Sequence, residues 1–400
     1  STLFPYTTLF RSPYRTVKKV FGKVHLWLGL ASGLIVLVVA LTGSLLVFEE
    51  ELELLFHRKQ LVVKEVMPQR KSYDELAAIV VAAYPDKKIK GMNISPEADR
   101  SVLFSVGKNK EELWYVAVDQ YTGQILGQRD YHKRFFTIME DLHRNLLLGK
   151  TGKAITGVSC LIFITLLISG LIIWWPAAKA AVKQRFRIKW KAKFKRVNWD
   201  FHAVFGFYSF IFLLVIAATG LVWSYPWVNK MIFVLSDGKP QEKYKAPLNK
   251  SPETTSDAGI YEKVVKETNR VYAFKGELRI SFPLEDSLSI SVFKENKETR
   301  LANVSSGGWF DRRNAEVLRL RPYETETTGM KVRRLIYPIH TGSLYGWPTK
   351  IIAFVVTLFA ASLPITGTMI WLGRKKKAKK KAAKVPKGIK IARPELVNVG

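Results

Sequence analysis

The sequence predicts an integral membrane protein in which an internal duplication forms an α-helical four-span bundle with two extracytoplasmic α+β domains. Three observations predict this fold. Four segments are long and apolar enough to cross a bilayer, which requires about 20 apolar residues. Long polar segments separate the first span from the second and the third from the fourth. The order of span, polar segment and span occurs twice with matching motifs, which is typical of a duplicated unit.

The predicted segments follow from this alternation of apolar and polar stretches. In order, they are a span at 24–48, an outer domain with a membrane-proximal helix at 49–150, a span at 153–175, a basic loop at 177–199, a span at 201–223, an outer domain at 226–345, a span at 348–371 and a basic tail at 374–400. Residues 1–12 are set aside. They contain TLFPYTTLFRS, which looks like the in-frame translation of a sequencing adapter, so we interpret them as an adapter-derived artefact.

Both outer domains are predicted to combine a helix with antiparallel strands. In the first, Ser72 and Glu75 are spaced as a capping box at the start of a helix, and Pro85 follows its end. Alternating apolar and polar residues then predict a hairpin with a turn at 121–123. The second domain repeats this order, with a turn at 311–314. Each domain is therefore expected to fold on its own core.

Histidines mark the first and third spans at matching positions. His25 precedes Thr42 by 17 residues, and His202 precedes Thr219 by the same interval. A glycine follows each threonine. An ionisable residue in or beside a span is by default a functional hypothesis.

The second and fourth spans are preceded by histidines in the same way. His143 lies 27 residues before Gly170, and His340 lies 27 before Gly367. Four of the six histidines thus occupy repeat-equivalent positions. The other two, His57 and His132, have no histidine at the equivalent position and are expected to be surface residues.

Glycines follow the span histidines at helical spacing. Gly29 and Gly33 lie one and two turns after His25, and Gly206 lies one turn after His202. Such positions can be sites of close helix packing. They also leave room for a flat macrocycle to lie against a helix, and the sequence leaves both readings open.

The positive charge is concentrated in three short segments. The formal net charge is +30; five Lys/Arg precede His25, nine lie in the loop 177–199 without any acid, and eleven lie in the tail with one acid. Residues 49–150 carry 16 bases and 16 acids. This positive-inside pattern predicts that both termini and the loop 177–199 are cytoplasmic and that the two large segments face outward. It argues against a nucleic-acid partner. The single cysteine, Cys160, excludes covalent CxxCH haem attachment.

Four motifs resemble those of the PepSY-associated transmembrane proteins. They are HLWLGLASGL…LTGSLLVFEEE, VAVDQYTGQILG, LHRNLLLGKTG and IHTGSLYGWP, and the resemblance extends from about Val17 to Gly373. The group includes iron-regulated membrane proteins and periplasmic ferric-siderophore reductases. The resemblance implies four spans with two PepSY-like outer domains, and its reductases are similar to di-haem b cytochromes. The turn at 311–314 departs from the usual Asp-x-x-Thr-Gly turn.

The four matched histidines are predicted to be axial ligands of two non-covalently bound b haems. Two neutral imidazoles give a six-coordinate iron suited to one-electron transfer. A pseudo-two-fold axis would pair His25 with His202 and His143 with His340, near opposite membrane surfaces. The alternative is that each histidine is an interfacial or capping residue. Cations that could neutralise the haem propionates are Lys18, Lys19, Lys23 and Arg196 inside, and Arg144, Lys150, Arg333 and Arg334 outside.

These features favour transmembrane electron transfer ending in the reduction of ferric siderophores, a haem-dependent oxidoreductase activity. Quinol or a cytoplasmic reductase would donate the electrons, since the chain has no dinucleotide-binding motif. Arg312, Arg313 and Trp347 are candidate residues for binding an anionic ferric chelate. Alternatives are a haem-free PepSY protein acting in protein interaction or protease regulation, and a haem subunit for another periplasmic reductase. The spans contain no mid-membrane charged pair, which argues against a transporter.

Overall fold

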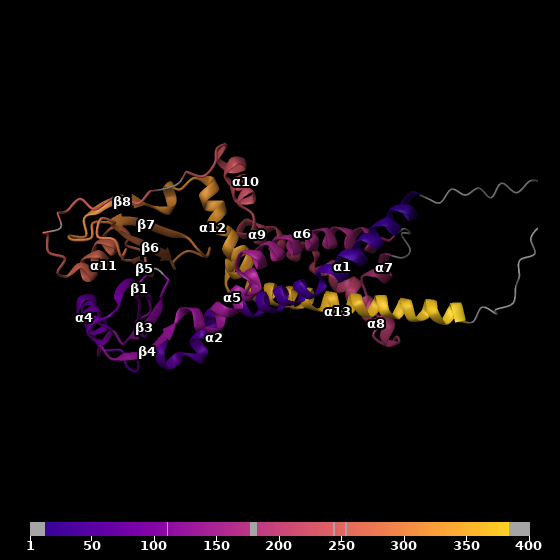
Figure 1. Cartoon of the computed structure of the whole chain (residues 1–400), viewed down its shortest axis with the longest axis horizontal. Helices are drawn as coiled ribbons and strands as arrows, with labels where there is room; N and C mark the ends of the chain where they lie inside the picture. Colours follow the sequence, from indigo (N-terminus) through magenta and orange to yellow (C-terminus); the bar gives the residue numbers. More distant parts are fainter. Residues whose placement is uncertain (1–12, 110, 177–181, 243–244, 253, 384–400) are drawn as a thin grey trace, which may run out of the picture. The chain divides into compact units, whose positions relative to one another are not determined.

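The computed structural model describes residues 13–109, 111–176, 182–242, 245–252 and 254–383 (Figure 1). The predicted artefact 1–12, the start of the basic loop at 177–181 and the end of the basic tail at 384–400 lie outside the described residues. The chain forms two compact units. Unit one comprises residues 1–37, 165–210 and 359–400, and unit two comprises residues 38–164 and 211–358.

Four helical stretches among the described residues are long and apolar enough to cross a membrane. They are Thr16–Leu46, Gly149–Trp174, Phe194–Ser224 and Trp347–Lys376. The helices that contain them are α1 (Pro13–Leu46), α6 (Gly149–Trp174), α8 (Phe194–Asp200) with α9 (Gly206–Ser224), and α13 (Trp347–Ala383). The predicted four spans are therefore confirmed, and the boundary between the two units crosses every one of them.

The described residues of unit two form one antiparallel sheet of eight strands. The strands are β1 (Lys88–Ile94), β2 (Val102–Gly107), β3 (Trp114–Val118), β4 (Ile125–Asp130), β5 (Gly276–Ser281), β6 (Ile290–Asn296), β7 (Ser305–Phe310) and β8 (Val317–Arg321). Their order is β4-β3-β2-β1-β5-β6-β7-β8. Strands β1 and β5 pair with Met92 opposite Ile280. This pairing satisfies backbone groups that two separate sheets would leave exposed at their edges.

The expectation of a separate core for each outer segment is wrong, because both segments share one core. Helices α4 (Tyr73–Ala83) and α11 (Ile260–Val271) contribute Leu76 and Val264 to it, and the sheet contributes Phe104, Val292 and Phe310. All five side chains are fully buried. Phe104 and Val292 lie on the same face of the sheet, because Phe104 pairs with Met92, Met92 with Ile280 and Ile280 with Val292 across adjacent strands.

The predicted capping box and first turn are present. The Ser72 side chain accepts the Glu75 N–H, and the Glu75 carboxylate accepts the Ser72 N–H at 2.7 Å. Gly123 has φ +79°, and Asp119 Oδ1 accepts the N–H groups of the turn. In the second turn Asp311 plays the part of Asp119 and accepts the Arg313 N–H. The departure from the Asp-x-x-Thr-Gly pattern therefore leaves the aspartate's capping role intact.

Short helices connect the sheet to the spans or link the spans to one another. They are α2 (Glu49–Phe56), α3 (Arg58–Leu61), α5 (Phe135–Asn145), α7 (Val182–Arg185), α10 (Pro226–Asp237) and α12 (Thr328–Thr341), with single turns at Tyr131–Lys133, Tyr323–Thr325 and Ser343–Tyr345.

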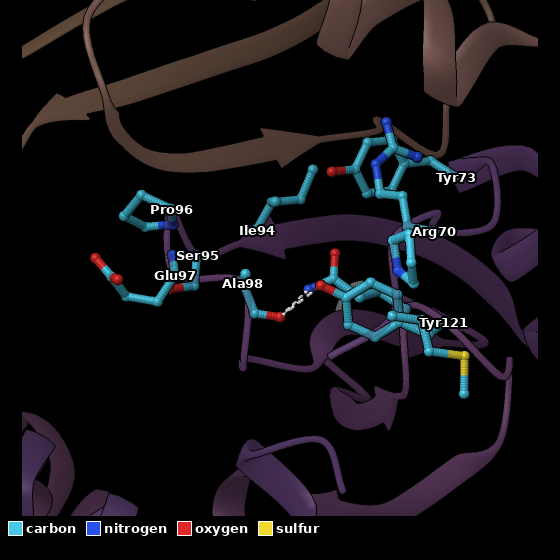
Figure 2. A pocket seen from close by; sticks show the side chains of 11 residues that line it. Arg70, Tyr73, Ile94, Ser95, Pro96, Glu97, Ala98 and Tyr121 are labelled. Carbon is cyan, nitrogen blue, oxygen red and sulfur yellow. Dashed lines mark hydrogen bonds between the residues drawn. The ribbon is translucent and has the colours of Figure 1, made fainter. Parts of the chain in front are cut away.

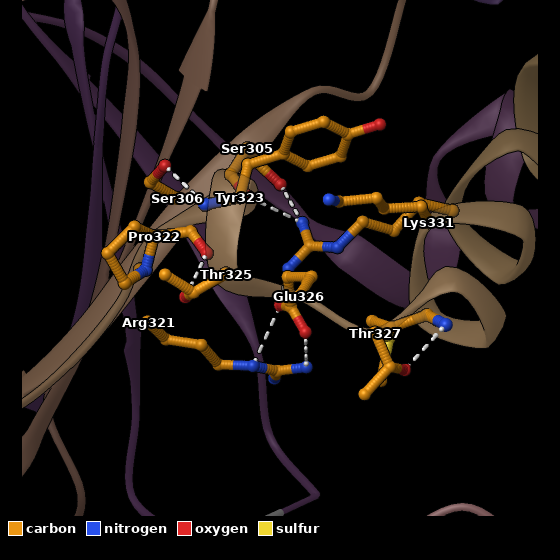
Figure 3. Close-up of polar contacts among 12 residues, drawn as sticks. Ser305, Ser306, Arg321, Pro322, Tyr323, Thr325, Glu326, Thr327 and Lys331 are labelled. Carbon is orange, nitrogen blue, oxygen red and sulfur yellow. Dashed lines mark hydrogen bonds and ion pairs between the residues drawn. The ribbon is translucent and has the colours of Figure 1, made fainter. Parts of the chain in front are cut away.

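Two buried glutamates tie the outer strands of the sheet to α5 and α12. Glu326 accepts from Arg321 of β8 and, at 2.8 Å, from Arg334 of α12 (Figure 3). Glu53 of α2 pairs in the same way with Arg129 of β4 and with Arg134, which precedes α5. Each half of the chain thus has a carboxylate held between two guanidinium groups. Such groups are costly to leave unpaired inside a protein.

Candidate functional site

The structure brings the four matched histidines together in two pairs. In unit one His25 of α1 faces His202, with ring centres 6.3 Å apart. In unit two His143 of α5 faces His340 of α12, with ring centres 6.2 Å apart. We call them pair A and pair B. Each pair joins the two halves of the chain, as the sequence offsets suggest.

In pair A each imidazole is held by a hydroxyl of a neighbouring long helix. His25 Nδ1 lies 3.0 Å from Ser169 Oγ of α6, and His202 Nδ1 lies 2.8 Å from Thr366 Oγ1 of α13. Ser169 donates its own proton to Leu166 O, and Thr366 donates to main-chain carbonyls of α13. Both hydroxyls therefore accept from the imidazoles, which places the ring proton on Nδ1.

In pair B main-chain carbonyl groups accept the hydrogen bonds from the imidazole rings. His143 Nδ1 lies 2.9 Å from Val39 O of α1, and His340 Nδ1 lies 2.9 Å from Ile216 O of α9. A carbonyl can only accept, so Nδ1 is again the protonated nitrogen. A threonine hydroxyl three residues along each helix also approaches Nδ1; these are Thr42 at 3.3 Å and Thr219 at 3.1 Å.

All four imidazoles are consequently in the tautomer that leaves the Nε2 lone pair free for a metal. Burial lowers the pKa of His340 to about 4 and also lowers the pKa of His143, so that both rings of pair B are neutral near pH 7. A hydrogen bond from the second ring nitrogen is the usual way in which a protein orients a metal-binding histidine.

Glycines make room for the four rings. A Cβ added at Gly43 would lie 2.9 Å from His143 Cε1, and one at Gly220 would lie 3.1 Å from His340 Cε1. The corresponding distances at Gly170 and Gly367, to His25 and His202, are both 3.3 Å. Each glycine directly follows the serine or threonine that contacts the same ring. One Ser/Thr-Gly dipeptide per long helix therefore cradles one histidine.

The spacing within each pair matches two imidazoles on opposite sides of one metal ion. A metal–imidazole bond is ~2.0 Å long and a ring nitrogen lies ~1.1 Å from the ring centre, which places the two centres roughly 6 Å apart. The observed distances are 6.3 and 6.2 Å. Groups of three or more His, Cys, Asp or Glu arranged for a metal ion are absent from the described residues. The donor set is therefore two imidazoles, which fits an iron whose other four ligands come from a macrocycle.

The backbone around His202 departs from regular α-helix. Residues Phe201–Phe205 form a turn of π-helix between α8 and α9, a feature frequently found at functional sites. Two buried residues just before it anchor the turn. Asn198 donates to Thr366 O at 3.1 Å, and Asp200 pairs with Arg196 at 2.9 Å.

The glycines predicted to lie beside a macrocycle pack on neighbouring helices. A Cβ at Gly29 would lie 3.8 Å from Leu166, and one at Gly206 would lie 4.0 Å from Leu363. At Gly33 the nearest atom would be Pro364 Cβ at 3.3 Å. Gly29 and Gly206 thus make the same loose contact in the two halves, while Gly33 is a tighter helix-packing position.

Most of the cations predicted to neutralise propionates have protein partners. Lys18 donates to the carbonyls of Ile173 and Trp175 at the end of α6, so it caps that helix. Four arginines also have partners: Arg196 contacts Asp200, Arg144 contacts Glu140, Arg333 contacts Asn229 and Arg334 contacts Glu326. The two histidines without repeat equivalents, His57 and His132, make no contact with another histidine among the described residues. His57 lies 3.9 Å from Glu53, and the exposed His132 contacts Glu111 O.

The residues predicted to bind a ferric chelate belong to different elements. Arg312 and Arg313 lie in the turn between β7 and β8, where they contact Asp286 at 3.2 Å and Asp257 at 3.8 Å. Trp347 begins α13 and packs on Phe48 with ring centres 5.6 Å apart. Both arginines thus already have acidic partners within unit two.

A hollow of about 230 Å³ lies beside α4 (Figure 2). Its cation, Arg70, is bound by both carboxylate oxygens of Glu262 and lies over the Tyr73 ring. Tyr121 and Gln120 both donate to Ala98 O. Its polar groups are therefore largely satisfied by the protein, and none of its lining residues is a histidine.

Sequence reasoning missed the hydroxyls that orient the histidines. The recurring Ser/Thr-Gly dipeptides were a signal for them, but not a selective one. The same dipeptide also occurs at 32–33, 122–123, 151–152, 156–157, 306–307, 328–329 and 341–342. Only the contacts in three dimensions identify the four that hold an imidazole.

The fold and the site define a class: a membrane protein with four candidate spans, an antiparallel sheet and two facing histidine pairs. The sequence model of the PepSY-associated TM region matches residues 23–374, which is most of the chain. The protein therefore belongs to the PepSY-associated TM region family. A search of the curated proteins found none that matches the chain.

Proposed function

We propose that the protein is a di-haem b membrane protein that moves single electrons across the bacterial inner membrane and reduces ferric siderophores in the periplasm. The observation that carries this proposal is the repeated pair of facing imidazoles, with centres 6.3 and 6.2 Å apart and Nδ1 engaged in all four rings. Two such pairs at matching positions favour a shared ligand chemistry over four interfacial histidines.

His25 and His202 would hold one haem, and His143 and His340 the other. A haem with two imidazole ligands exchanges single electrons and leaves no iron position open to substrate. The serine and threonine hydroxyls and the carbonyls of α1 and α9 would keep each ring in the ligating tautomer and orientation. Matched contacts in the two halves also support an origin by internal duplication.

The charge distribution supports the proposed orientation of the protein in the membrane. The basic segments favour cytoplasmic termini and a periplasmic sheet. Quinol in the bilayer or a cytoplasmic reductase at the basic loop would supply the electrons. Siderophores bind Fe(III) through hard oxygen ligands and hold Fe(II) more weakly, so that the addition of one electron to the ferric ion releases the metal.

Two measurements test the proposal. Protein expressed with sufficient haem should be red and give a sharp α band in the reduced-minus-oxidised spectrum. In stopped-flow mixing, ferric siderophores should reoxidise the reduced protein faster than a generic acceptor does. Colourless protein would favour a haem-free interaction role. Red protein that siderophores reoxidise no faster than the generic acceptor would point to a haem subunit of another periplasmic reductase.

A further inference from the structure

The face of the sheet opposite the shared core lines a hollow of about 600 Å³ in unit two, which we call the chamber. Adjacent strands bring its polar side chains into rows: Ser105 pairs with Tyr115, Tyr115 with Arg129, and Asn93 with Arg279. Cavities of this volume are in the range that binds small molecules.

The elements that close the chamber are those that hold pair B. Leu46 and Val47 line it and follow Gly43, the glycine against His143, by one turn of α1. Tyr337 and Thr341 line it from α12, on either side of His340 along the chain. A molecule in the chamber would therefore contact the same helical segments that position the pair B imidazoles.

The charges of the chamber wall are balanced. Four carboxylates and four cations line it: Glu49, Glu50, Glu53 and Glu277, with Arg129, Arg134, Arg279 and Lys350. The cations already have acidic partners. Arg129 and Arg134 pair with Glu53, Lys350 lies 2.7 Å from Glu51, and Arg279 lies 3.1 Å from Glu277.

The ligand chemistry follows from this balance. A chelate with three negative charges would meet as many carboxylates as cations and would gain little electrostatic attraction. An uncharged chelate would lose little by leaving water, and the hydroxyl and amide groups of Ser105, Tyr115, Tyr337, Thr341 and Asn93 could hydrogen-bond to its oxygens. Three hydroxamates neutralise one Fe(III), whereas three catecholates leave a charge of −3.

We propose that the chamber binds the ferric siderophore and selects uncharged chelates with hydroxamate ligands over triply anionic catecholate chelates. The proposal rests on the proposed function for the identity of the ligand. It places the substrate in the chamber and not at the turn that contains Arg312 and Arg313, where the sequence alone suggested a site for an anionic chelate.

The test uses the full-length protein in detergent and gallium(III) chelates, which have the charge and shape of the ferric forms but accept no electron. Calorimetric titration should show the gallium trihydroxamate binding at least roughly tenfold more tightly than the gallium tris-catecholate. Equal or tighter binding of the catecholate overturns the proposal. Because this binding needs neither haem nor electron transfer, a colourless protein that still binds the trihydroxamate would contradict the proposed function alone.

Variants locate the site. The double substitution Glu50→Lys with Glu277→Lys makes the chamber wall positive and should shift the preference toward the tris-catecholate by roughly tenfold or more. Glu65→Lys with Glu316→Lys is the matched control, because it makes the same change in net charge outside the chamber lining. Ser105→Trp should fill the chamber and abolish trihydroxamate binding. Arg312→Ala with Arg313→Ala should leave trihydroxamate binding unchanged. Loss of trihydroxamate binding in this variant, or its retention in Ser105→Trp, would overturn the assignment.

Discussion

Pair A and pair B have nearly the same spacing between their rings, but different groups hold the rings. In pair A both histidines lie within the spans, and side-chain hydroxyls hold their rings. In pair B both histidines lie on short helices beside the spans, and main-chain carbonyls hold their rings. Helices α5 and α12 are in turn tied to the sheet through the buried glutamates. The positions of the pair A rings therefore depend on helix packing, and those of the pair B rings depend on the sheet as well.

The largest expected effect comes from breaking the link to the sheet. Glu326 is buried, and Glu326→Ala would leave Arg321 and Arg334 without their shared carboxylate. Loss of one partner from a buried ionic cluster costs about 3–5 kcal/mol. Thermal unfolding of the purified protein should show this loss. Haem content should fall at pair B first, because α12 carries His340.

Glu324→Ala is the control for this change, because Glu324 lies in the same turn but is exposed. It should leave the unfolding temperature and the haem content unchanged. An unfolding temperature for Glu326→Ala equal to that of the control would contradict the proposed link between the sheet and pair B.

The next largest effect is expected from substitution of the glycines that pack against the imidazole rings. Gly43→Ala would place a Cβ 2.9 Å from the His143 ring, which is closer than real Cβ contacts, so that the imidazole must move. Gly170→Ala would give 3.3 Å from the His25 ring, which a small shift can relieve. We expect Gly43→Ala to lose most of one haem and Gly170→Ala to keep both. Haem quantitation against protein mass measures the difference, and equal losses would show that the glycines do not set the ring positions.

A smaller effect should distinguish rings that a side-chain hydroxyl holds from rings that a main-chain carbonyl holds. Ser169→Ala removes the contact of His25 Nδ1 with the serine hydroxyl, whereas Thr42→Val leaves His143 Nδ1 its carbonyl at 2.9 Å. Loss of such a partner typically weakens metal binding by roughly 10- to 100-fold. Haem dissociation to an apo-myoglobin acceptor should therefore accelerate at pair A in Ser169→Ala and change little at pair B in Thr42→Val. Ser32→Ala is the matched control, because the Ser32 hydroxyl donates to Leu28 O of its own helix.

The smallest effect is expected at the π-turn. Asn198 donates to Thr366 O, and Asn198→Ala should cost about 1 kcal/mol, the net value of one hydrogen bond. The midpoint potential of the haem proposed at pair A should shift slightly, while that of the haem proposed at pair B stays constant. A spectroelectrochemical titration in which only the pair B potential moves would contradict this assignment.

Much of this architecture could be predicted because it depends on local sequence. Span length and apolar composition specify the four helices, and equal offsets from shared motifs identify which histidines pair. The single sheet could not be predicted, since the pairing of β1 with β5 joins strands that are far apart in the chain. The hydrogen-bond partners of the imidazole rings could not be predicted from the sequence either. Ser169 and Thr366 differ in type, and nothing local distinguishes them from Ser32 or Thr156.

The buried glutamates show a further limit of sequence reasoning. Glu53 precedes strands β1–β4 in the chain, whereas Glu326 follows strands β5–β8. The two glutamate–arginine clusters therefore occupy different places in the two halves. No repeat offset connects them, although each holds two arginines. Similar contacts in the fold thus arise from residues that a repeat alignment does not match.

The most direct test of the central claim is haem stoichiometry in variants that remove one pair at a time. Wild-type protein should contain two haems per chain, His25→Ala with His202→Ala one, and His143→Ala with His340→Ala one, each with the low-spin spectrum of the remaining pair. His57→Ala with His132→Ala should retain both. Retention of two haems after loss of either pair, or the absence of haem from the wild type, would contradict the account.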